Sequence, residues 1–247
     1  MITYEGLTIT DGDMFFDMLR DDVMFRKCDF DDADFRNIET DSLIIDSCTL
    51  SRADLTNLVC PALRMTNSVA ENVVLERIET HDAEITGSNL TSARLRRAQL
   101  NLAKIIDSDL SGADLFETNL FGADLTGSRL RGVDLASARL DGLKIERTDF
   151  SLASLRGHSF RGQRLEGINF TEADLGGCDF TDVVFVDCHL AGAFVDEQTR
   201  FDGADLRGAV ISGSHLVRAS LKGALMLPSQ VNTLVFDGFG IVVADVS

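Results

Sequence analysis

The sequence has no tryptophan, a single tyrosine and only two prolines, and no apolar run in it approaches the ~18 residues that could span a bilayer. It also lacks an N-terminal charged segment followed by an apolar one, which a secretory signal would have. We therefore expect a soluble, cytoplasmic protein with no part in the membrane.

Basic residues are scarce as well. The chain has 23 Lys and Arg against 40 Asp and Glu, which gives a formal net charge of −17. A field of this sign repels nucleic acids and anionic membranes, so the sequence argues against both as partners.

Features of an enzyme or a metal protein are missing too. The four histidines are scattered, no glycine-rich loop could hold a phosphate, and no Ser–His–Asp order is readable. The five cysteines include no C-x-x-C pair, so no metal site is predicted. All five fall on columns that we expect to face inward, where free cysteine packs as a small apolar residue. We expect no catalytic residues and no cofactor.

What the sequence does have is a repeat of five residues. From Phe25 to Val195, 31 of the 35 positions at this spacing are Leu, Ile, Phe, Met or Val. The register slips by one residue within 195–201 and then resumes from Phe201 to Met226, with six of six positions large and apolar. Neither a straight helix nor a straight strand keeps residues at this spacing on one side. The pattern therefore predicts a chain that bends once in every repeat.

Two further columns support the bend. The residue two positions before each large one is usually small, as at Ala113 and Ala123, and it should share the inward side. The residue two positions after it should form the corner, and 15 of the 20 glycines lie there, including Gly112 and Gly208. Four corners close a coil of 20 residues, and about ten such coils would stack at ~4.8 Å into a rod on the order of 50 Å long.

The segments "GADLF" (112–116), "GADLT" (122–126) and "GADLR" (203–207) resemble the signature of the pentapeptide-repeat family. The resemblance covers about residues 23–226 and implies an all-β fold, a right-handed quadrilateral parallel β-helix. The expected organisation is an N-terminal cap (1–22) with a short helix, the β-helix (23–226), and a C-terminal helix and strand (227–247).

Some repeats depart from the pattern. Thr40, Cys60 and Thr80 are undersized at the large position, but each follows an oversized residue two positions earlier, which conserves core volume. Ala70 has no such compensation, so the segment 60–80 is where we expect a bulge or an outward loop. His158 and Gln163 occupy inward sites in adjacent repeats. We expect a buried polar pair whose members satisfy each other, with a ligand site as the alternative.

The C-terminal segment begins with Pro228, which favours the start of a helix. It is similar to the ending of the quinolone-resistance and gyrase-inhibiting members of the family, in which this element joins two copies. The resemblance implies a homodimer, and the alternative is a helix that only caps one monomer. The candidate interface residues are Val231, Leu234, Val235 and Phe239.

Acidic residues concentrate in the first 90 residues, which carry 19 acids and 7 bases, a net charge of −12. Such a surface could occupy a groove built for DNA. The resemblance then implies a protein that mimics DNA and binds a type II topoisomerase, DNA gyrase or topoisomerase IV, either modulating it or protecting it from inhibitors. The candidate acidic surface comprises Asp29, Asp31, Asp32, Asp34, Asp41, Asp46 and Asp54.

A different surface is offered by Phe116 and Phe121, each directly after an inward leucine and so expected to face solvent. Two exposed aromatic side chains in adjacent repeats could anchor a protein partner. The alternative function is therefore a scaffold for protein interactions with no role at topoisomerases.

Overall fold

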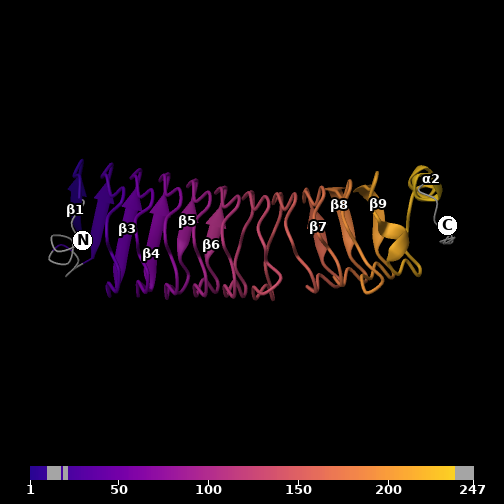
Figure 1. The fold of residues 1–247 in the computed structure, drawn as a ribbon, viewed down its shortest axis with the longest axis horizontal. Coiled ribbons are helices and arrows are strands. Elements are labelled where there is room, and N and C mark those ends of the chain that lie inside the picture. The colour runs from indigo at the N-terminus through magenta and orange to yellow at the C-terminus, as the bar shows by residue number, and fades with distance from the viewer. Residues whose placement is uncertain (10–17, 19–21, 237–247) are drawn as a thin grey trace. The chain divides into compact units, whose positions relative to one another are not determined.

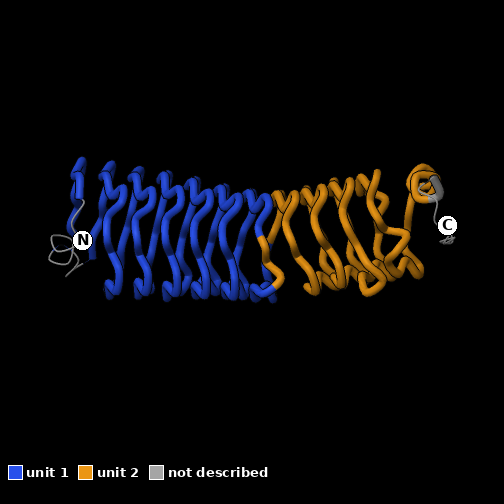
Figure 2. Tube along the Cα trace, in the orientation of Figure 1, with its two compact units in different colours: residues 1–133, 137–144 blue, residues 134–136, 145–247 orange. Residues whose placement is uncertain are grey.

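The computed structural model describes residues 1–9, 18 and 22–236. The chain winds into a parallel β-solenoid of about ten turns, which confirms the fold expected from the repeat. It divides into two compact units (Figure 2): unit 1 comprises residues 1–133 and 137–144, and unit 2 comprises residues 134–136 and 145–247. The helix expected near residues 10–22 falls almost entirely outside the described residues.

Unit 1 contains a six-stranded parallel sheet whose strands follow one another in sequence order (Figure 1). From β2 onward, paired residues lie 20 positions apart, as Phe25 and Ile45 do. Strand β1 pairs with β2 at a spacing of 21, so parallel pairing already begins within the segment that the sequence assigned to the cap. The strands are β1 (Ile2–Glu5), β2 (Val23–Arg26), β3 (Ser42–Asp46), β4 (Ala62–Thr66), β5 (Glu84–Thr86) and β6 (Lys104–Ile106).

Single parallel bridges join the other three sides of each turn. In the turn near residue 90, for example, they link Glu79 to Gln99, Asn89 to Asp109, and Arg94 to Asp114. Through most of unit 1, each turn is therefore paired with the next along all four sides, and outward side chains line up in columns with a spacing of 20 residues.

Unit 2 repeats this arrangement with a three-stranded parallel sheet of β7 (Arg164–Glu166), β8 (Val184–His189) and β9 (Asp205–Val210). A short 3-10 helix, η1 (Leu216–Arg218), follows β9, and the helix α2 (Pro228–Phe236) comes after it, with Pro228 at its start as predicted. The buried side chain of Gln230 fastens α2 to β9. Its Nε2 donates hydrogen bonds to the backbone oxygens of Leu206 and Ala209 at 2.7 and 2.8 Å.

The corners form at the residue two positions after the inward large side chain, as predicted. The backbone φ there is 66° at Gly112, 58° at Asn72 and 61° at Leu102. Glycine adopts this left-handed conformation without strain, whereas other residues adopt it at a cost. Among the described residues, twenty other than glycine nevertheless do so. The pairing between turns therefore imposes the corner even where the sequence offers no glycine.

Gly208 is an exception, and the prediction of a corner there is wrong. It lies inside β9, where the pairing with β8 shifts register, and its φ is not in the left-handed region. A Cβ atom at this position would lie 2.5 Å from the backbone oxygen of Phe185. Glycine is needed here because two backbones approach closely.

The core consists of the predicted inward columns. Leu115 and its small partner Ala113 are 1% and 4% exposed. In unit 2, phenylalanine rings stack along the columns, as Phe160 does on Phe180 with ring centroids 5.2 Å apart. Cys60 and Thr80 are both fully buried, together with their oversized partners, so volume is redistributed between the two inward sites.

The segment 60–80 is regular, and the expectation of a bulge or an outward loop is wrong. All of it lies among the described residues, and β4 pairs in register with β3 on one side and β5 on the other. Ala70 is fully buried, and its N–H donates to the backbone oxygen of Asn89 at 2.7 Å. Backbone pairing on both sides keeps the path regular despite the small side chain.

A buried ladder of small polar side chains runs along one inward column of unit 1. Each member after the first accepts a hydrogen bond from the backbone N–H of the member one turn earlier: Ser88 Oγ lies 3.2 Å from the nitrogen of Ser68, and Cys48 Sγ lies 3.3 Å from that of Cys28. The Ser88 hydroxyl donates to the backbone oxygen of Thr86 at 3.1 Å. The ladder consists of Cys28, Cys48, Ser68, Ser88, Ser108 and Ser128.

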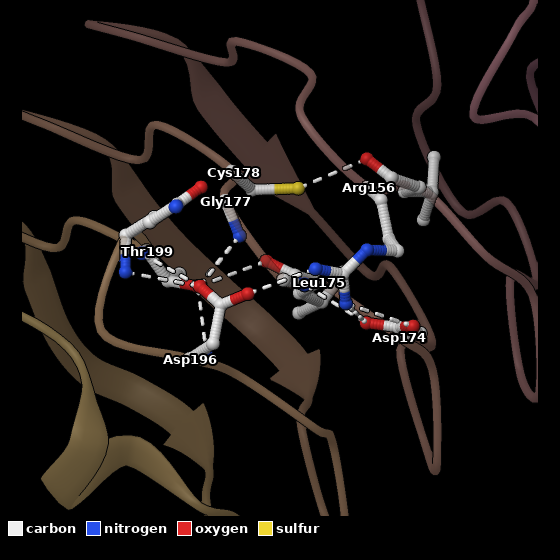
Figure 3. Close-up of polar contacts among 10 residues, drawn as sticks. Arg156, Asp174, Leu175, Gly177, Cys178, Asp196 and Thr199 are labelled. Carbon is white, nitrogen blue, oxygen red and sulfur yellow. Dashed lines mark hydrogen bonds and ion pairs between the residues drawn. The ribbon is translucent and has the colours of Figure 1, made fainter.

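Near residue 196 the spacing between paired residues changes from 20, as for Asp174 and Phe194, to 21, as for Asp179 and Arg200. The side chain of Asp196 stabilises the extra residue (Figure 3). Its Oδ1 accepts hydrogen bonds from the backbone nitrogens of Gly177, Gln198 and Thr199 at 2.9–3.2 Å.

Two further interactions complete this region. The Thr199 hydroxyl donates to the Leu175 oxygen at 3.1 Å, and Arg156 pairs with both Asp174 and Asp196 at 3.0 and 2.9 Å. Partial burial opposes ionisation of Asp196, but the hydrogen bonds outweigh it, so its pKa lies below the usual 3.8.

Replacing Ser88 with alanine should destabilise the protein by about 1–3 kcal/mol, because the buried N–H of Ser68 loses its acceptor. Urea unfolding followed by circular dichroism measures the change. Ser88→Cys is the matched control and should cost less, since Cys48 already fills the same role in the ladder. Equal stability of Ser88→Ala and the parent protein would contradict the role of the ladder.

Replacing Asp196 with alanine should cost about 1–3 kcal/mol at pH 7, because three backbone N–H groups lose their acceptor. The folded-state pKa of Asp196 is lowered, so its stabilising effect is present above pH 3.8 and is lost as the pH falls further. The stability difference between Asp196→Ala and the parent should therefore shrink in acid. Glu197→Ala, an exposed neighbour, is the control and should change little. A difference that persisted unchanged at pH 3 would argue against this assignment.

Candidate protein-binding face

Arginines neutralise much of the acidic surface proposed from the sequence. Arg52 lies 2.6 Å from Asp32, one turn away, and Arg36 lies 2.5 Å from Asp34. The hydrogen bonds of these arginines lower the pKa of Asp32 and of Asp34. Arg36 also lies 3.9 Å from Asp54.

The other candidate carboxylates differ in their surroundings. Asp46 accepts from Thr66 and pairs with Arg26 at 3.1 Å; these contacts lower its pKa, with the Thr66 hydrogen bond the larger cause. Asp29 and Asp31 accept hydrogen bonds from neighbouring backbone and side-chain groups. Among the described residues, Asp41 is the one candidate without an ion pair or a hydrogen bond to its side chain.

A different acidic surface remains unneutralised on one side of unit 1. We call the side whose outward residues are Glu39, Val59, Glu79, Gln99, Asn119 and Arg139 the Glu39 face; parallel bridges link each of these residues to the next. Along this column the first turns carry two acidic side chains, the middle carries two neutral amides, and the last turn carries one basic side chain. Asn119 Nδ2 donates to Gln99 Oε1 at 3.1 Å, which ties the neutral middle together.

The corner that directly follows the Glu39 face in sequence adds further acidic side chains next to Glu39 and Glu79. It carries Asp41 and, two turns later, His81 and Asp82, all three exposed. Among the described residues, no ion pair involves Glu39, Asp41, Glu79 or Asp82. These four carboxylates are therefore available to a cationic partner at one end of the face.

Apolar side chains border the neutral middle of the same face. Phe116 and Phe121 lie at its two corners and are 38% and 40% exposed, and Leu102 is 50% exposed. The guanidinium of Arg96 lies 4.6 Å from the centroid of Phe116, and that of Arg139 lies 4.6 Å from the centroid of Phe121. Such cation–π contacts hold the rings in place while leaving part of each exposed.

The sequence reasoning identified Asp41, Phe116 and Phe121 but missed Glu39, Glu79, Asp82 and Leu102. The candidate acidic surface comprised aspartates from the acidic first 90 residues, irrespective of whether a cation lies one turn away. The sequence does contain the information needed to find them, because residues 20 positions apart share a column. This spacing brings Arg52 next to Asp32, whereas it brings only Val59 next to Glu39.

His158 and Gln163 are half-buried, and the expected bond between them is not found among the described residues. His158 Nε2 instead lies 2.8 Å from the backbone oxygen of Leu135. The same bond, to the carbonyl 23 residues earlier, is made by Thr118 and Cys178. His158 thus follows a rule of the fold, in which a polar inward side chain hydrogen-bonds to the backbone carbonyl of an inward leucine 23 residues earlier.

Three other expectations concern the cysteines, metal binding and the membrane. All five cysteines are free and buried, and burial raises the pKa of the Cys48 thiol to about 11. Within the described part of the chain, no three His, Cys, Asp or Glu side chains gather so as to hold a metal ion. No helix among the described residues is long and apolar enough to cross a membrane.

The candidate dimer residues lie on or beyond α2. Leu234 is 8% exposed and packs within its own chain, whereas Val231 is half-exposed. The side chain of Val235, all of Phe239 and the expected terminal strand lie outside the described residues.

The chain is similar to proteins of one family. The model for pentapeptide repeats matches eight copies, over residues 83–120, 118–157, 160–196 and 197–226. No curated protein matches the chain.

Solved structures with partial similarity include HetL, a pentapeptide repeat protein involved in heterocyst differentiation regulation from the cyanobacterium Nostoc sp. strain PCC 7120. The identity is 19%, with 90% of each chain covered and a TM-score of 0.41. Full-length QnrB1, a plasmid-mediated fluoroquinolone resistance protein, is 15% identical, with 95% of this chain and 98% of that chain covered and a TM-score of 0.31. Similarity at this level carries no argument about function.

Proposed function

The chain belongs to the pentapeptide-repeat family, and we propose that it is a non-enzymatic cytoplasmic protein that acts by binding a partner protein through the Glu39 face. The observation that carries this proposal is the combination, on one side of unit 1, of four carboxylates that form no ion pair with the described residues and three exposed apolar side chains. Exposed apolar side chains beside uncompensated charge are typical of a binding surface.

The partner we favour is a type II topoisomerase, DNA gyrase or topoisomerase IV. Residues 1–90 carry 19 acids and 7 bases, a net charge of −12. A groove that binds DNA presents cations to a line of phosphates, and a column of carboxylates can take the place of that line. The chain would then act as a DNA mimic that modulates the enzyme or protects it from inhibitors.

The ion pairs restrict where such mimicry can reside. Asp32, Asp34 and Asp46 already have arginine partners, which reduces the field they present. We therefore propose that the mimicking surface comprises Glu39, Asp41, Glu79 and Asp82, on the side of unit 1 that also carries the apolar residues.

The second candidate function is a protein-interaction scaffold without a topoisomerase role. It is favoured by Phe116 and Phe121, whose rings the neighbouring arginines hold in place. Binding of this kind depends on apolar contact and resists salt, whereas binding by a charge mimic weakens as salt screens the charges.

We further propose that the protein is a homodimer joined through its C-terminal segment. Since Leu234 packs within its own chain, Val231 is the described residue best placed to contact a second copy.

For the topoisomerase proposal, the double variant E39Q/E79Q should weaken binding to purified gyrase and reduce the effect on DNA supercoiling, with and without a quinolone. Two exposed carboxylates at a charged interface should together change the affinity by about three- to thirty-fold. The matched control is D32N/D34N, which removes the same formal charge from ion-paired sites and should have less effect.

Two results would contradict the proposal. No change in supercoiling at high micromolar protein would remove the topoisomerase as partner. Binding that persists in about 0.5 M salt and is lost in F116S/F121S would instead favour the scaffold, because screening at that ionic strength suppresses interactions between exposed charges.

For the dimer, sedimentation at micromolar concentration should give twice the chain mass of 26.9 kDa. Val231→Asp should shift the protein to a monomer, because a charge would be buried against the second copy. Asn232→Asp, at an exposed neighbouring position of α2, places the same charge outside the contact and should leave the dimer intact. A monomeric parent protein would rule the dimer out.

A further inference from the structure

A pocket of about 430 Å³ opens beside the acidic end of the Glu39 face. It is lined by Pro61, Ala62, Leu63, Arg64, His81, Asp82 and Glu84, all in unit 1. Pro61, Ala62, His81 and Asp82 are exposed, so the pocket is accessible from solvent.

The pocket arises where two neighbouring turns follow different paths around the same corner. Ala62 begins β4 and does not adopt the left-handed conformation, whereas Asp82, one turn later, has φ of 57°. The pocket thus lies where the backbone conformation of this corner changes from one turn to the next.

The lining has an apolar part and a charged part. Pro61 and Ala62 supply the apolar surface. Glu84 is occupied, since it pairs with Arg64 at 2.6 Å and with Lys104 at 3.3 Å, and these hydrogen bonds lower its pKa. Asp82 has no ion pair among the described residues, so its carboxylate is the group left for a guest.

The surroundings add to the negative charge. Asp41 lies on the same column as Pro61 and His81, and Glu39 and Glu79 lie on the adjoining face. None of these three carboxylates is neutralised by a cation of the described chain. Charge complementarity therefore selects a cationic guest and disfavours an acidic one.

We propose that this pocket receives a lysine or arginine side chain of the partner protein. The methylene groups of that side chain would cover Pro61 and Ala62, and its charged end would meet Asp82 with support from Asp41. Long basic side chains combine an apolar stem with a charged head, which matches this lining. The inference rests on the proposed function only in that the partner is a protein bound at this side of unit 1.

The test uses the full-length protein and a small probe, N-acetyl-arginine-N-methylamide, titrated while backbone amide signals are recorded by nuclear magnetic resonance. The expected result is a saturable shift of the amides of Ala62, His81 and Asp82. The corresponding citrulline compound has nearly the same shape without the charge, and it should produce much smaller shifts. Equal shifts with both compounds, or shifts spread evenly over the acidic surface, would overturn the proposal.

Variants localise the effect. Asp82→Asn should raise the dissociation constant of the arginine probe about two- to five-fold, since one exposed charge interaction is lost. Asparagine tolerates the left-handed conformation, so the corner should be kept. Asp107→Asn changes another left-handed corner of unit 1, with φ of 49°, and is the matched control. Equal affinities of the two variants would contradict the assignment.

The outcome is independent of the topoisomerase assay. Binding of the probe without any effect on supercoiling would leave the pocket as a basic side-chain site for another protein. A topoisomerase effect without probe binding would overturn the pocket and leave the proposed function standing.

Discussion

The structure depends on one constraint: through most of each unit, the sides of one turn pair in parallel with their equivalents about 20 positions away in the next turn. This pairing holds the large side chain of every repeat inside and forces a corner at a fixed offset. Its strength is visible at Leu102 and Glu117, which adopt the left-handed conformation that glycine would adopt more readily. At these two positions, the pairing between turns outweighs the backbone preference of the residue itself.

The same constraint organises the surface. Because outward side chains repeat with the turn, oppositely charged residues in one column meet as neighbours, and an unmatched residue stays unmatched. Arg52 next to Asp32 and Arg97 next to Glu117 are examples of the first case. Glu39 next to Val59 is an example of the second. The distribution of free charge therefore depends on which side chains meet within a column and between neighbouring columns, and a regional sum of charges does not reveal it.

Much of the fold could be predicted because each five-residue repeat corresponds to one side of a four-sided turn. The inward columns and most corners follow from it, and the start of α2 at Pro228 follows from the preference of proline for the first turn of a helix. The regular path of 60–80 and the strand conformation of Gly208 could not be predicted, because each depends on pairing with a neighbouring turn rather than on the local residues. The candidate face was only partly foreseen. Asp41 and the exposed phenylalanines could be named from their offsets, but the neutralisation of Asp34 by Arg36 required side-chain geometry.

The network around Asp196 has a consequence for how such a chain can change in evolution. Adding one residue to a solenoid would normally reverse inside and outside for everything that follows. Here a single carboxylate substitutes for the missing backbone acceptors, and the inward columns continue on the far side through Phe201 and Leu206, both fully buried. The effect of a one-residue insertion is thereby confined to one corner. Repeats whose register differs by one residue can then follow one another in the same chain, with no change to the repeats on either side.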